Sequence, residues 1–240
     1  MISIKNVTKK FGDFKAVDGL TLDILSGEIF GFLGPNGAGK TTTIKMMTGI
    51  LSPNEGDIVI NGYSIVKEPL EAKRQFGFVP DSPDLFLRLK GIEYLNFIGD
   101  VYEVDSETRQ QRIMELTKKL EIDDALNDRL ITYSHGMRQK IIIIGALLHQ
   151  PKVWILDEPL TGLDPRSSAV LKEMMNEHVS KGNTVFFSTH VLDTAEKICD
   201  RVGIINKGKL IFVGSLQEMR EHASENKSLE RMFLEMTDDE

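Results

Sequence analysis

The segment GPNGAGKTT, residues 34–42, constrains the fold of this chain more than any other stretch. An apolar run at residues 29–33 precedes it, and residues 43–47 after it continue as a predicted helix. The segment contains the pattern G-x-x-x-x-G-K-[ST], whose fixed positions are Gly34, Gly39, Lys40 and Thr41. A strand, a glycine-rich loop and a helix start in this order predict a phosphate-binding loop.

The residue types in this loop suit a nucleoside triphosphate. Glycines let backbone N–H groups curl around phosphate oxygens without Cβ clashes, and the helix N-terminus adds unpaired donors and partial positive charge. We expect Lys40 to reach the β- and γ-phosphates and the Thr41 hydroxyl to hold Mg²⁺. The alternative is a glycine-rich turn that carries a lysine by chance. The predicted nucleotide contacts are Asn36, Gly37, Ala38, Gly39, Lys40, Thr41 and Thr42.

The rest of the chain changes character along its length. Alternating apolar residues at 2–7 predict an edge-type strand of a small antiparallel sheet before the loop. From about residue 83 to 150, strand signals vanish and apolar residues recur at helical spacing, which predicts an inserted helical segment. The isoleucines at 141–144 are predicted to be helical, because only Gly145 interrupts their segment. After residue 153, strands alternate with helices, which predicts a parallel sheet with crossover connections.

Composition limits the partners and the compartment. The chain has 240 residues, a natural size for one core with an inserted subdomain, and its net charge of -7 argues against binding to nucleic acid. Cys199 is the only cysteine, so no internal disulfide can form and a reducing compartment fits. The apolar run at 141–148 is far shorter than the roughly 20 residues of a membrane span. Residues 1–10 lack the apolar region of a signal peptide.

A second chemical pattern is an apolar strand that ends in two carboxylates. Residues 153–156 are apolar, and Asp157 and Glu158 follow them directly. In phosphate-loop proteins, the acid at the end of such a strand holds Mg²⁺ through water, and Asp157 fits that role. Glu158 comes next in the chain and should point differently, so it can act as a base toward the attacking water. A strand that ends in solvated acids is the alternative.

The motifs, taken in chain order, resemble those of an ABC transporter ATPase subunit. They are the phosphate loop, YSHGM at 133–137, LDEP at 156–159, GLD at 162–164 and STH at 188–190. The resemblance covers about residues 1 to 214 and implies an α/β fold. This fold is a P-loop NTPase with a RecA-like parallel sheet core, an N-terminal antiparallel β subdomain and an inserted α-helical subdomain at about 83–150. A C-terminal helical tail at 215–240 would follow the ATPase domain at 1–214.

The resemblance also implies a head-to-tail dimer that sandwiches two ATP molecules. Phe11 matches the aromatic that stacks on adenine, with Val17 on the same face, although Phe11 could instead be a core residue at a strand end. His190 matches the histidine that hydrogen-bonds the γ-phosphate. Each ATP would also be contacted across the dimer, and the matching residues here are Ser134, Gly136 and Asp164.

The sequence departs from the family pattern at two sites. His135 stands where the family usually has glycine and Met137 where it has glutamine, so bulk and possible positive charge are added at the anion site. Asp81 stands where the family has a glutamine after a strand at 76–79. An aspartate can accept hydrogen bonds from the waters of Mg²⁺ but cannot donate as an amide does, so its role as a metal residue is open. Lys40 and the acids at 157 and 158 are intact, so we expect ATP hydrolysis to survive.

The family resemblance implies a transport function and membrane partners. The tail segment at 228–237 resembles the ending of ABC-2 export ATPases, a group that includes drug and antibiotic exporters; an ordinary amphipathic surface helix is the alternative. An integral membrane permease would dock near Asp84, Leu85, Phe86, Leu87 and Arg88, unless these residues pack as an ordinary loop. The protein would then be cytoplasmic and peripheral on the inner face of the cell membrane. A soluble ABC ATPase without a transport role and a regulatory nucleotide-binding subunit are the alternative functions.

Overall fold

The computed structural model describes residues 1–83, 86–221 and 233. The docking candidates Asp84 and Leu85 lie outside the described residues, and so does the part of the predicted tail beyond residue 221, except for Phe233. Across these described ranges, no helix combines the length and the apolar character that a bilayer crossing requires.

Strands and helices follow one another in an order that matches the predicted change from a small β region to helices and then to alternating β and α. The strands are β1 (Ile2–Phe11), β2 (Phe14–Ile24), β3 (Ile29–Leu33), β4 (Glu55–Ile60), β5 (Tyr63–Ser64), β6 (Phe76–Val79), β7 (Val153–Asp157), β8 (Thr184–Thr189), β9 (Arg201–Asn206) and β10 (Lys209–Gly214). The α-helices are α1 (Lys40–Met47), α2 (Pro69–Arg74), α3 (Gly91–Val101), α4 (Ser106–Lys119), α5 (His135–Leu147), α6 (Pro165–Ser180), α7 (Leu192–Ile198) and α8 (Leu216–Glu221). Short 3-10 helices lie at η1 (Asp123–Ala125) and η2 (Leu130–Thr132).

The first sheet is antiparallel and has the strand order β2-β1-β4-β5. Strand β1 lies inside it, because Ile2 pairs with Ile24 on one side and with Ile60 on the other. The prediction of an edge strand at residues 2–7 was therefore wrong. Alternation of apolar and polar residues reports which face of a strand is buried, and it carries no information about how many of its edges are paired.

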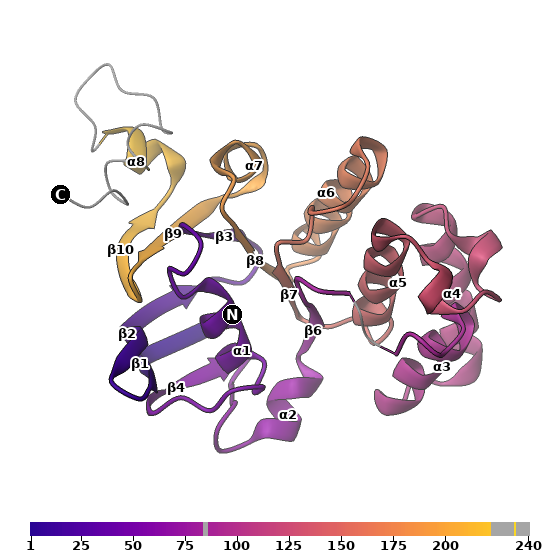
Figure 1. Cartoon of the computed structure of the whole chain (residues 1–240), viewed down its shortest axis with the longest axis horizontal. Coiled ribbons are helices and arrows are strands. Elements are labelled where there is room, and N and C mark those ends of the chain that lie inside the picture. The colour runs from indigo at the N-terminus through magenta and orange to yellow at the C-terminus, as the bar shows by residue number, and fades with distance from the viewer. Residues whose placement is uncertain (84–85, 222–232, 234–240) are drawn as a thin grey trace.

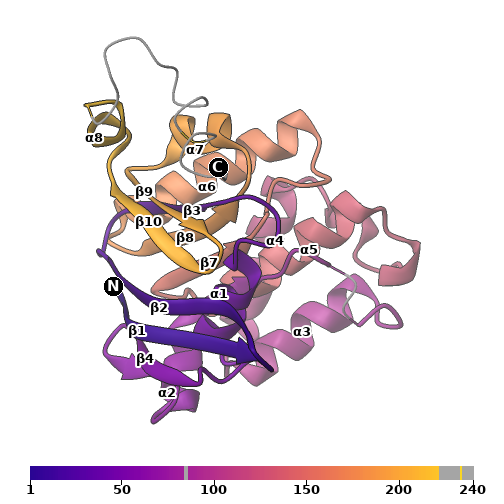
Figure 2. The ribbon, with the colours of Figure 1, turned by 60° about the vertical axis from the view of Figure 1, so that its left-hand side comes forward.

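The second sheet has the order β10-β9-β3-β8-β7-β6 and carries the predicted parallel core. Strands β9, β3, β8, β7 and β6 run parallel, and only β10 pairs antiparallel. The carboxyl ends of β3, β8 and β7 therefore lie side by side in the middle of the sheet. Helix α1 contacts β2 and β7, whereas α6 and α7 contact β3 and β8 (Figures 1 and 2).

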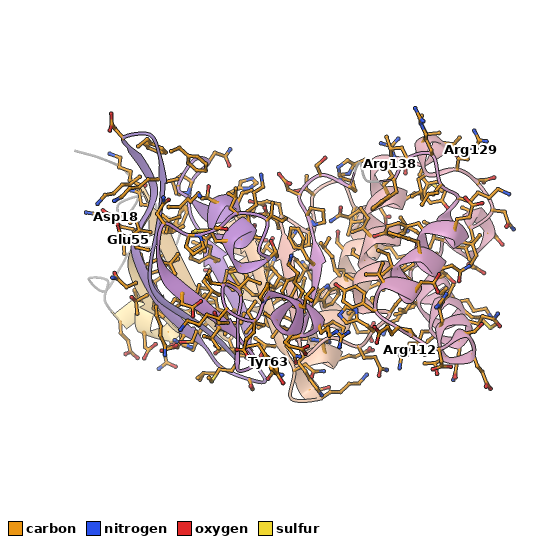
Figure 3. All side chains as sticks on the ribbon, turned by 90° about the horizontal axis from the view of Figure 1, so that it is seen from below. Asp18, Glu55, Tyr63, Arg112, Arg129 and Arg138 are labelled. Carbon is orange, nitrogen blue, oxygen red and sulfur yellow. The ribbon has the colours of Figure 1, made fainter. Side chains whose placement is uncertain are left out.

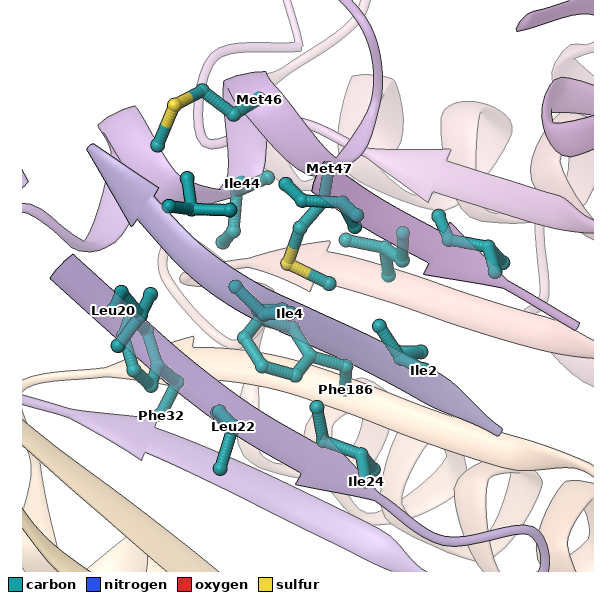
Figure 4. Packing of buried hydrophobic residues seen from close by; sticks show 14 of the residues in the cluster. Ile2, Ile4, Leu20, Leu22, Ile24, Phe32, Ile44, Met46, Met47 and Phe186 are labelled. Carbon is teal, nitrogen blue, oxygen red and sulfur yellow. The ribbon is translucent and has the colours of Figure 1, made fainter. Parts of the chain in front are cut away.

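Burial on both faces explains why the parallel strands are continuously apolar. In β7, Val153 and Ile155 belong to the cluster between the two sheets, while Trp154 and Leu156 belong to the cluster on the opposite face. Figure 4 shows the first cluster, in which side chains of β1 and β2 pack with α1 and with the strands of the larger sheet. A strand covered on both faces needs no polar alternation.

The helices between β6 and β7 lie at the opposite end of the molecule from the small sheet (Figure 1). Figure 3 marks the two ends, with Asp18 and Glu55 near the small sheet and Arg129 and Arg138 near the helices. Helix α5 contacts β6 and α3, and its isoleucines at 141–144 are all buried. The prediction of a buried helix there is confirmed, and so is the predicted α/β class with a parallel sheet and a smaller antiparallel sheet.

Candidate active site

The phosphate loop connects β3 to α1 and presses against neighbouring backbone. A methyl group built on Gly34 would collide with the carbonyl oxygen of Ile205, and one on Gly39 would lie 2.6 Å from the carbonyl oxygen of Ala16. Gly39 is also the N-cap of α1, with a left-handed φ of 111°. Glycine is the residue that accepts both the close approach and the positive φ. The predicted loop therefore has a physical requirement for its glycines.

Lys40 is buried at the first position of α1. Its Nζ donates to the carbonyl oxygens of Gly34 at 2.7 Å and Pro35 at 3.2 Å. The same Nζ lies 3.9 Å from Oε1 of Glu158. Burial lowers the pKa of Lys40, and the carboxylates of Glu158 and Asp157 oppose that shift. The ammonium group thus lies between the loop backbone and the acids at the end of β7.

Asp157 ends β7 and is 2 % exposed. Ser188 donates its hydroxyl to Oδ1 of Asp157 at 2.5 Å. Burial raises the pKa of Asp157, and hydrogen bonds from Ser188 and Thr41 act in the opposite direction. The carboxylate of Asp81 also raises the pKa of Asp157, so these two acids face a common region.

The oxygen groups of Thr41, Asp81 and Asp157 fit a Mg²⁺ site. Mg²⁺ binds oxygen, keeps several waters, and takes only one or two carboxylates from the protein when phosphates supply other ligands. In the described part of the chain, no three or more histidine, cysteine and acidic residues are grouped so that they could hold a metal ion. A hydroxyl and acids beside a phosphate loop suit a metal that arrives with the nucleotide.

Glu158 turns away from Asp157 because its backbone is left-handed, with a φ of 48°. Its Oε1 lies 2.9 Å from Nδ1 of His190, which follows β8. Its backbone N–H donates to Ser188 Oγ at 3.1 Å. The predicted base and the histidine predicted to bind the γ-phosphate are therefore in direct contact, although they are far apart in the sequence.

A cavity of about 350 Å³ opens beside Glu158 and His190. It is lined by Glu158, Pro159, Leu160, Thr161, Phe187, Thr189, His190, Val191 and Thr194. Carboxylate, imidazole and hydroxyl groups line part of its wall, and these groups can position a water next to the carboxylate.

The predicted cross-dimer residues form a second cluster at the start of α5. Ser134 is the N-cap of α5 and accepts a hydrogen bond from the Met137 N–H at 3.2 Å. The ring of His135 lies directly against Gly162 in the loop after β7. Gly162 thus makes room for the larger side chain of His135, which stands where the family usually has glycine. The motif alone did not indicate this contact.

Asp164 has a structural partner within its own chain. It is the N-cap of α6 and accepts hydrogen bonds from the Ser167 N–H at 2.9 Å and from the Ser167 hydroxyl at 2.5 Å. These bonds lower the pKa of Asp164 to about 2. Lys140 of α5 lies 4.0 Å from its carboxylate. Ser134 and Asp164 therefore both cap helices, whatever contacts they make with another chain.

The predicted adenine contacts lie on the small sheet. Phe11 ends β1 with an exposed ring, and Lys9 Nζ lies 5.5 Å from the ring centroid. Val17 is fully buried in the core, where it packs beneath the phosphate loop near Gly39. Its side chain thus supports the loop from below. Of the remaining predicted loop contacts, Asn36 and Gly37 are exposed, Ala38 is buried and Thr42 is partly buried.

Sequence reasoning assigned no role to two residues that connect the site. Ser188 contacts both Asp157 and Glu158 and lies opposite Asp157 in the β7–β8 register. Gln139 of α5 is buried and donates to the carbonyl oxygen of Pro159 at 3.4 Å. The Ser188 hydroxyl, two residues before His190, was visible in the sequence, but its partner depends on strand register.

Fold and site together define the class of protein. A glycine-rich phosphate loop, an acid pair and a histidine gather at the carboxyl ends of one parallel sheet, which is where ligands bind in open α/β folds. This is the arrangement of a nucleotide-binding P-loop ATPase.

Comparison with known proteins specifies the family. Residues 17–161 match the ABC transporter family. The linearmycin resistance ATP-binding protein LnrL of Bacillus subtilis is 36% identical over 91% of this chain and 70% of its own length. A solved structure of an ATP-binding subunit of an ABC transporter is 32% identical, with a TM-score of 0.93 over 98% of this chain and 99% of its own.

A further solved structure is that of the ATP-binding cassette MJ0796, described as dimeric, post-hydrolysis and bound to ADP and Pi. It is 26% identical, with a TM-score of 0.81 over 90% of this chain and 99% of its own. The chain belongs to the ATP-binding subunits of ABC transporters. It is an ATPase of that family.

Proposed function

We propose that the chain hydrolyses Mg²⁺-bound ATP with Glu158 as the general base and powers an ABC exporter. The observation that carries the catalytic part is the position of Glu158 Oε1, which lies 2.9 Å from His190 Nδ1 and 3.9 Å from Lys40 Nζ. Glu158 is therefore close to both His190 and Lys40, and each of these two residues is predicted to contact the γ-phosphate. Phosphoryl transfer asks mainly for positioning and charge neutralisation, and these groups provide both.

Each residue has a distinct part in the proposed reaction. Lys40 leaves the loop carbonyls and binds the β- and γ-phosphates, while the loop N–H groups hold the remaining phosphate oxygens. Thr41 and Asp157 would hold Mg²⁺, and Asp81 could accept hydrogen bonds at the same site. When bound, Mg²⁺ neutralises charge on the phosphates. Glu158 then takes a proton from the attacking water, and His190 holds Glu158 and the γ-phosphate in line.

Ser134, Gly136 and Asp164 are proposed to contact ATP bound by a second ATPase chain. The dimeric state of the MJ0796 cassette supports this arrangement. The cluster also has the right chemistry, because the N-terminus of α5 presents N–H donors to an anion. The second chain is another copy or a related subunit. His135 leaves open a heterodimer with unequal sites.

A membrane permease is proposed to dock where α3 meets the loop after Asp81. Phe86 and Phe97 are 48% and 43% exposed, and their ring centroids are 5.4 Å apart. Phe86 also contacts Tyr94, with ring centroids at 5.8 Å. Exposed aromatic side chains that cluster in this way are typical of interaction surfaces. The chain would thereby be peripheral on the inner face of the cell membrane.

Export is the proposed direction of transport. The similarity to a linearmycin resistance protein supports it. The resemblance of the tail at 228–237 to ABC-2 exporters points the same way, although this segment lies outside the described residues except for Phe233. No residue of the site selects the cargo, because an ATPase subunit contacts nucleotide and permease.

The test is ATPase activity of the purified chain beside Glu158→Gln, with size-exclusion chromatography in ATP and Mg²⁺. We expect wild type to turn over, and Glu158→Gln to lose turnover by at least about 100-fold while forming an ATP-dependent dimer. Unchanged turnover in Glu158→Gln would refute its role as base. A wild type that binds ATP without hydrolysing it, even with its permease present, would favour a regulatory subunit instead.

A further inference from the structure

Ser188 joins the two acids of the site through one hydroxyl group. Its side chain is fully buried on β8, directly opposite Asp157 in the pairing of β7 with β8. Its Oγ lies 2.5 Å from Asp157 Oδ1 and 3.1 Å from the backbone nitrogen of Glu158.

The chemistry of a hydroxyl settles the direction of both hydrogen bonds. An ionised carboxylate only accepts and a backbone N–H only donates. The single hydroxyl proton of Ser188 is therefore given to Asp157, and a lone pair of the same oxygen accepts the N–H of Glu158. This arrangement occupies Oδ1 of Asp157, and Thr41 makes a further hydrogen bond to the same carboxylate.

The backbone of Glu158 needs such support. Its φ of 48° is left-handed, and a residue other than glycine holds this conformation only when its surroundings enforce it. The hydrogen bond from the Glu158 N–H to Ser188 restrains the backbone of Glu158. The side-chain carboxylate of Glu158 contacts His190, which lies two positions beyond Ser188.

We infer that Ser188 is a positioning residue for ATP hydrolysis, which orients Asp157 toward the metal and Glu158 toward water through one buried hydroxyl. The inference rests on the proposed roles of these two acids. It gives β8 a role in catalysis besides leading into His190, because a shift of β8 would move both acids together. A misplacement of about 1 Å at reacting groups can cost on the order of 100-fold in rate.

The alternative is that Ser188 only satisfies buried polar groups and so stabilises the fold. Thr184 provides a matched control on the same strand. It is also fully buried, and its hydroxyl donates to the carbonyl oxygen of Leu25 at 3.1 Å, at the opposite end of β8 from the acids. Ser188→Ala and Thr184→Val each remove one buried hydroxyl, but only the first contacts the site.

The experiment compares ATPase kinetics, Mg²⁺ activation and thermal stability of wild type, Ser188→Ala and Thr184→Val. We expect Ser188→Ala to lower kcat about 10- to 100-fold with the KM for ATP within about 3-fold, and to raise the Mg²⁺ concentration for half activity. Thr184→Val should lower Tm by a similar amount and retain most of kcat.

Two further variants distinguish loss of the hydroxyl from misfolding. Ser188→Cys keeps the side-chain size but has a weak donor, and should show the same defect as Ser188→Ala. Ser188→Thr keeps the hydroxyl and should recover activity relative to Ser188→Ala. Equal kcat losses in Ser188→Ala and Thr184→Val, at equal Tm, would overturn the inference. Failure of Glu158→Gln to lose activity would instead overturn the proposed base, and these two outcomes are read from different variants.

Discussion

Histidines differ sharply between the two ends of the larger sheet. At the carboxyl ends, His190 is exposed and contacts the carboxylate of Glu158. At the amino ends, His149 Nε2 lies 3.1 Å from the carbonyl oxygen of Phe76 and the ring stacks on Tyr102. His178 packs edge-on against Trp154, with ring centroids 5.8 Å apart. Burial lowers the pKa of His149 and of His178 to about 4 in each case.

The difference shows how one fold separates chemistry from stability. At the carboxyl ends, the exposed His190 is paired with the carboxylate of Glu158. At the amino ends, the rings of His149 and His178 pack against Tyr102 and Trp154, and burial keeps each imidazole neutral. Variants at the carboxyl ends should therefore change activity, and variants at the amino ends should change stability.

Lys40→Ala should give the largest effect. Removing the cation next to the phosphate loop should lower ATPase activity by at least about 100-fold, because a preorganised charge at the phosphates is lost. The Tm should not fall, since burial disfavours the ammonium group in the folded chain. Lys45→Ala, an exposed position on the same helix, is the control and should keep full activity. Equal losses of ATPase activity in Lys40→Ala and Lys45→Ala would contradict the expectation that activity depends on the carboxyl ends of the sheet.

His178→Phe should change the pH dependence of stability without changing activity at pH 7.5. The folded pKa is about 4 and the reference value is 6.5, so between these values the unfolded chain binds a proton that the folded chain rejects. Stability from this neutral ring is fully present above pH 6.5 and is lost as the pH falls toward 4. Wild type should lose about 1–2 kcal/mol from this source between pH 7.5 and 5, and His178→Phe should lose less.

Chemical denaturation at both pH values measures this difference. His190→Phe is the counterpart from the other end of the sheet. It should lower ATPase activity, because the contact of His190 with the Glu158 carboxylate is lost. If His178→Phe and wild type lose equal stability at pH 5, the neutral buried ring is not the source of acid sensitivity.

Sequence patterns predicted those parts of the site that are local in the chain. The phosphate loop and the acids after β7 each combine a short motif with an element boundary, so the sequence places them at a strand end. The interior position of β1, the burial of Val17 and the link through Ser188 depend on which strands pair and in what register. Registers are set by tertiary packing, which no single segment encodes.

Variants of Ser134 test whether the N-terminus of α5 also contributes to ATP binding. Ser134→Ala removes the cap and should cost about 1 kcal/mol of stability, or a Tm lower by about 2–4 °C. Ser134→Asp keeps a good cap and should keep the Tm, but it adds negative charge where a phosphate of the second chain is proposed. It should therefore weaken ATP-dependent dimerisation, measured by size-exclusion chromatography in the Glu158→Gln background. Undiminished dimerisation of the Asp variant would restrict Ser134 to a capping role.

Asp81→Gln should give the smallest effect and tests how charge is balanced at the metal acids. Because Asp81 raises the pKa of Asp157, removing its charge should move the acid limb of the pH–rate profile to lower pH. At pH 7.5 and saturating Mg²⁺ we expect activity within about 3-fold of wild type, since one water-mediated contact is exchanged for another. Asp13→Asn, in the exposed turn before β2, is the control for lost charge. A loss as large as that of Lys40→Ala would make Asp81 an essential metal residue, and the carboxyl-end site would then depend on an acid where the family usually has an amide.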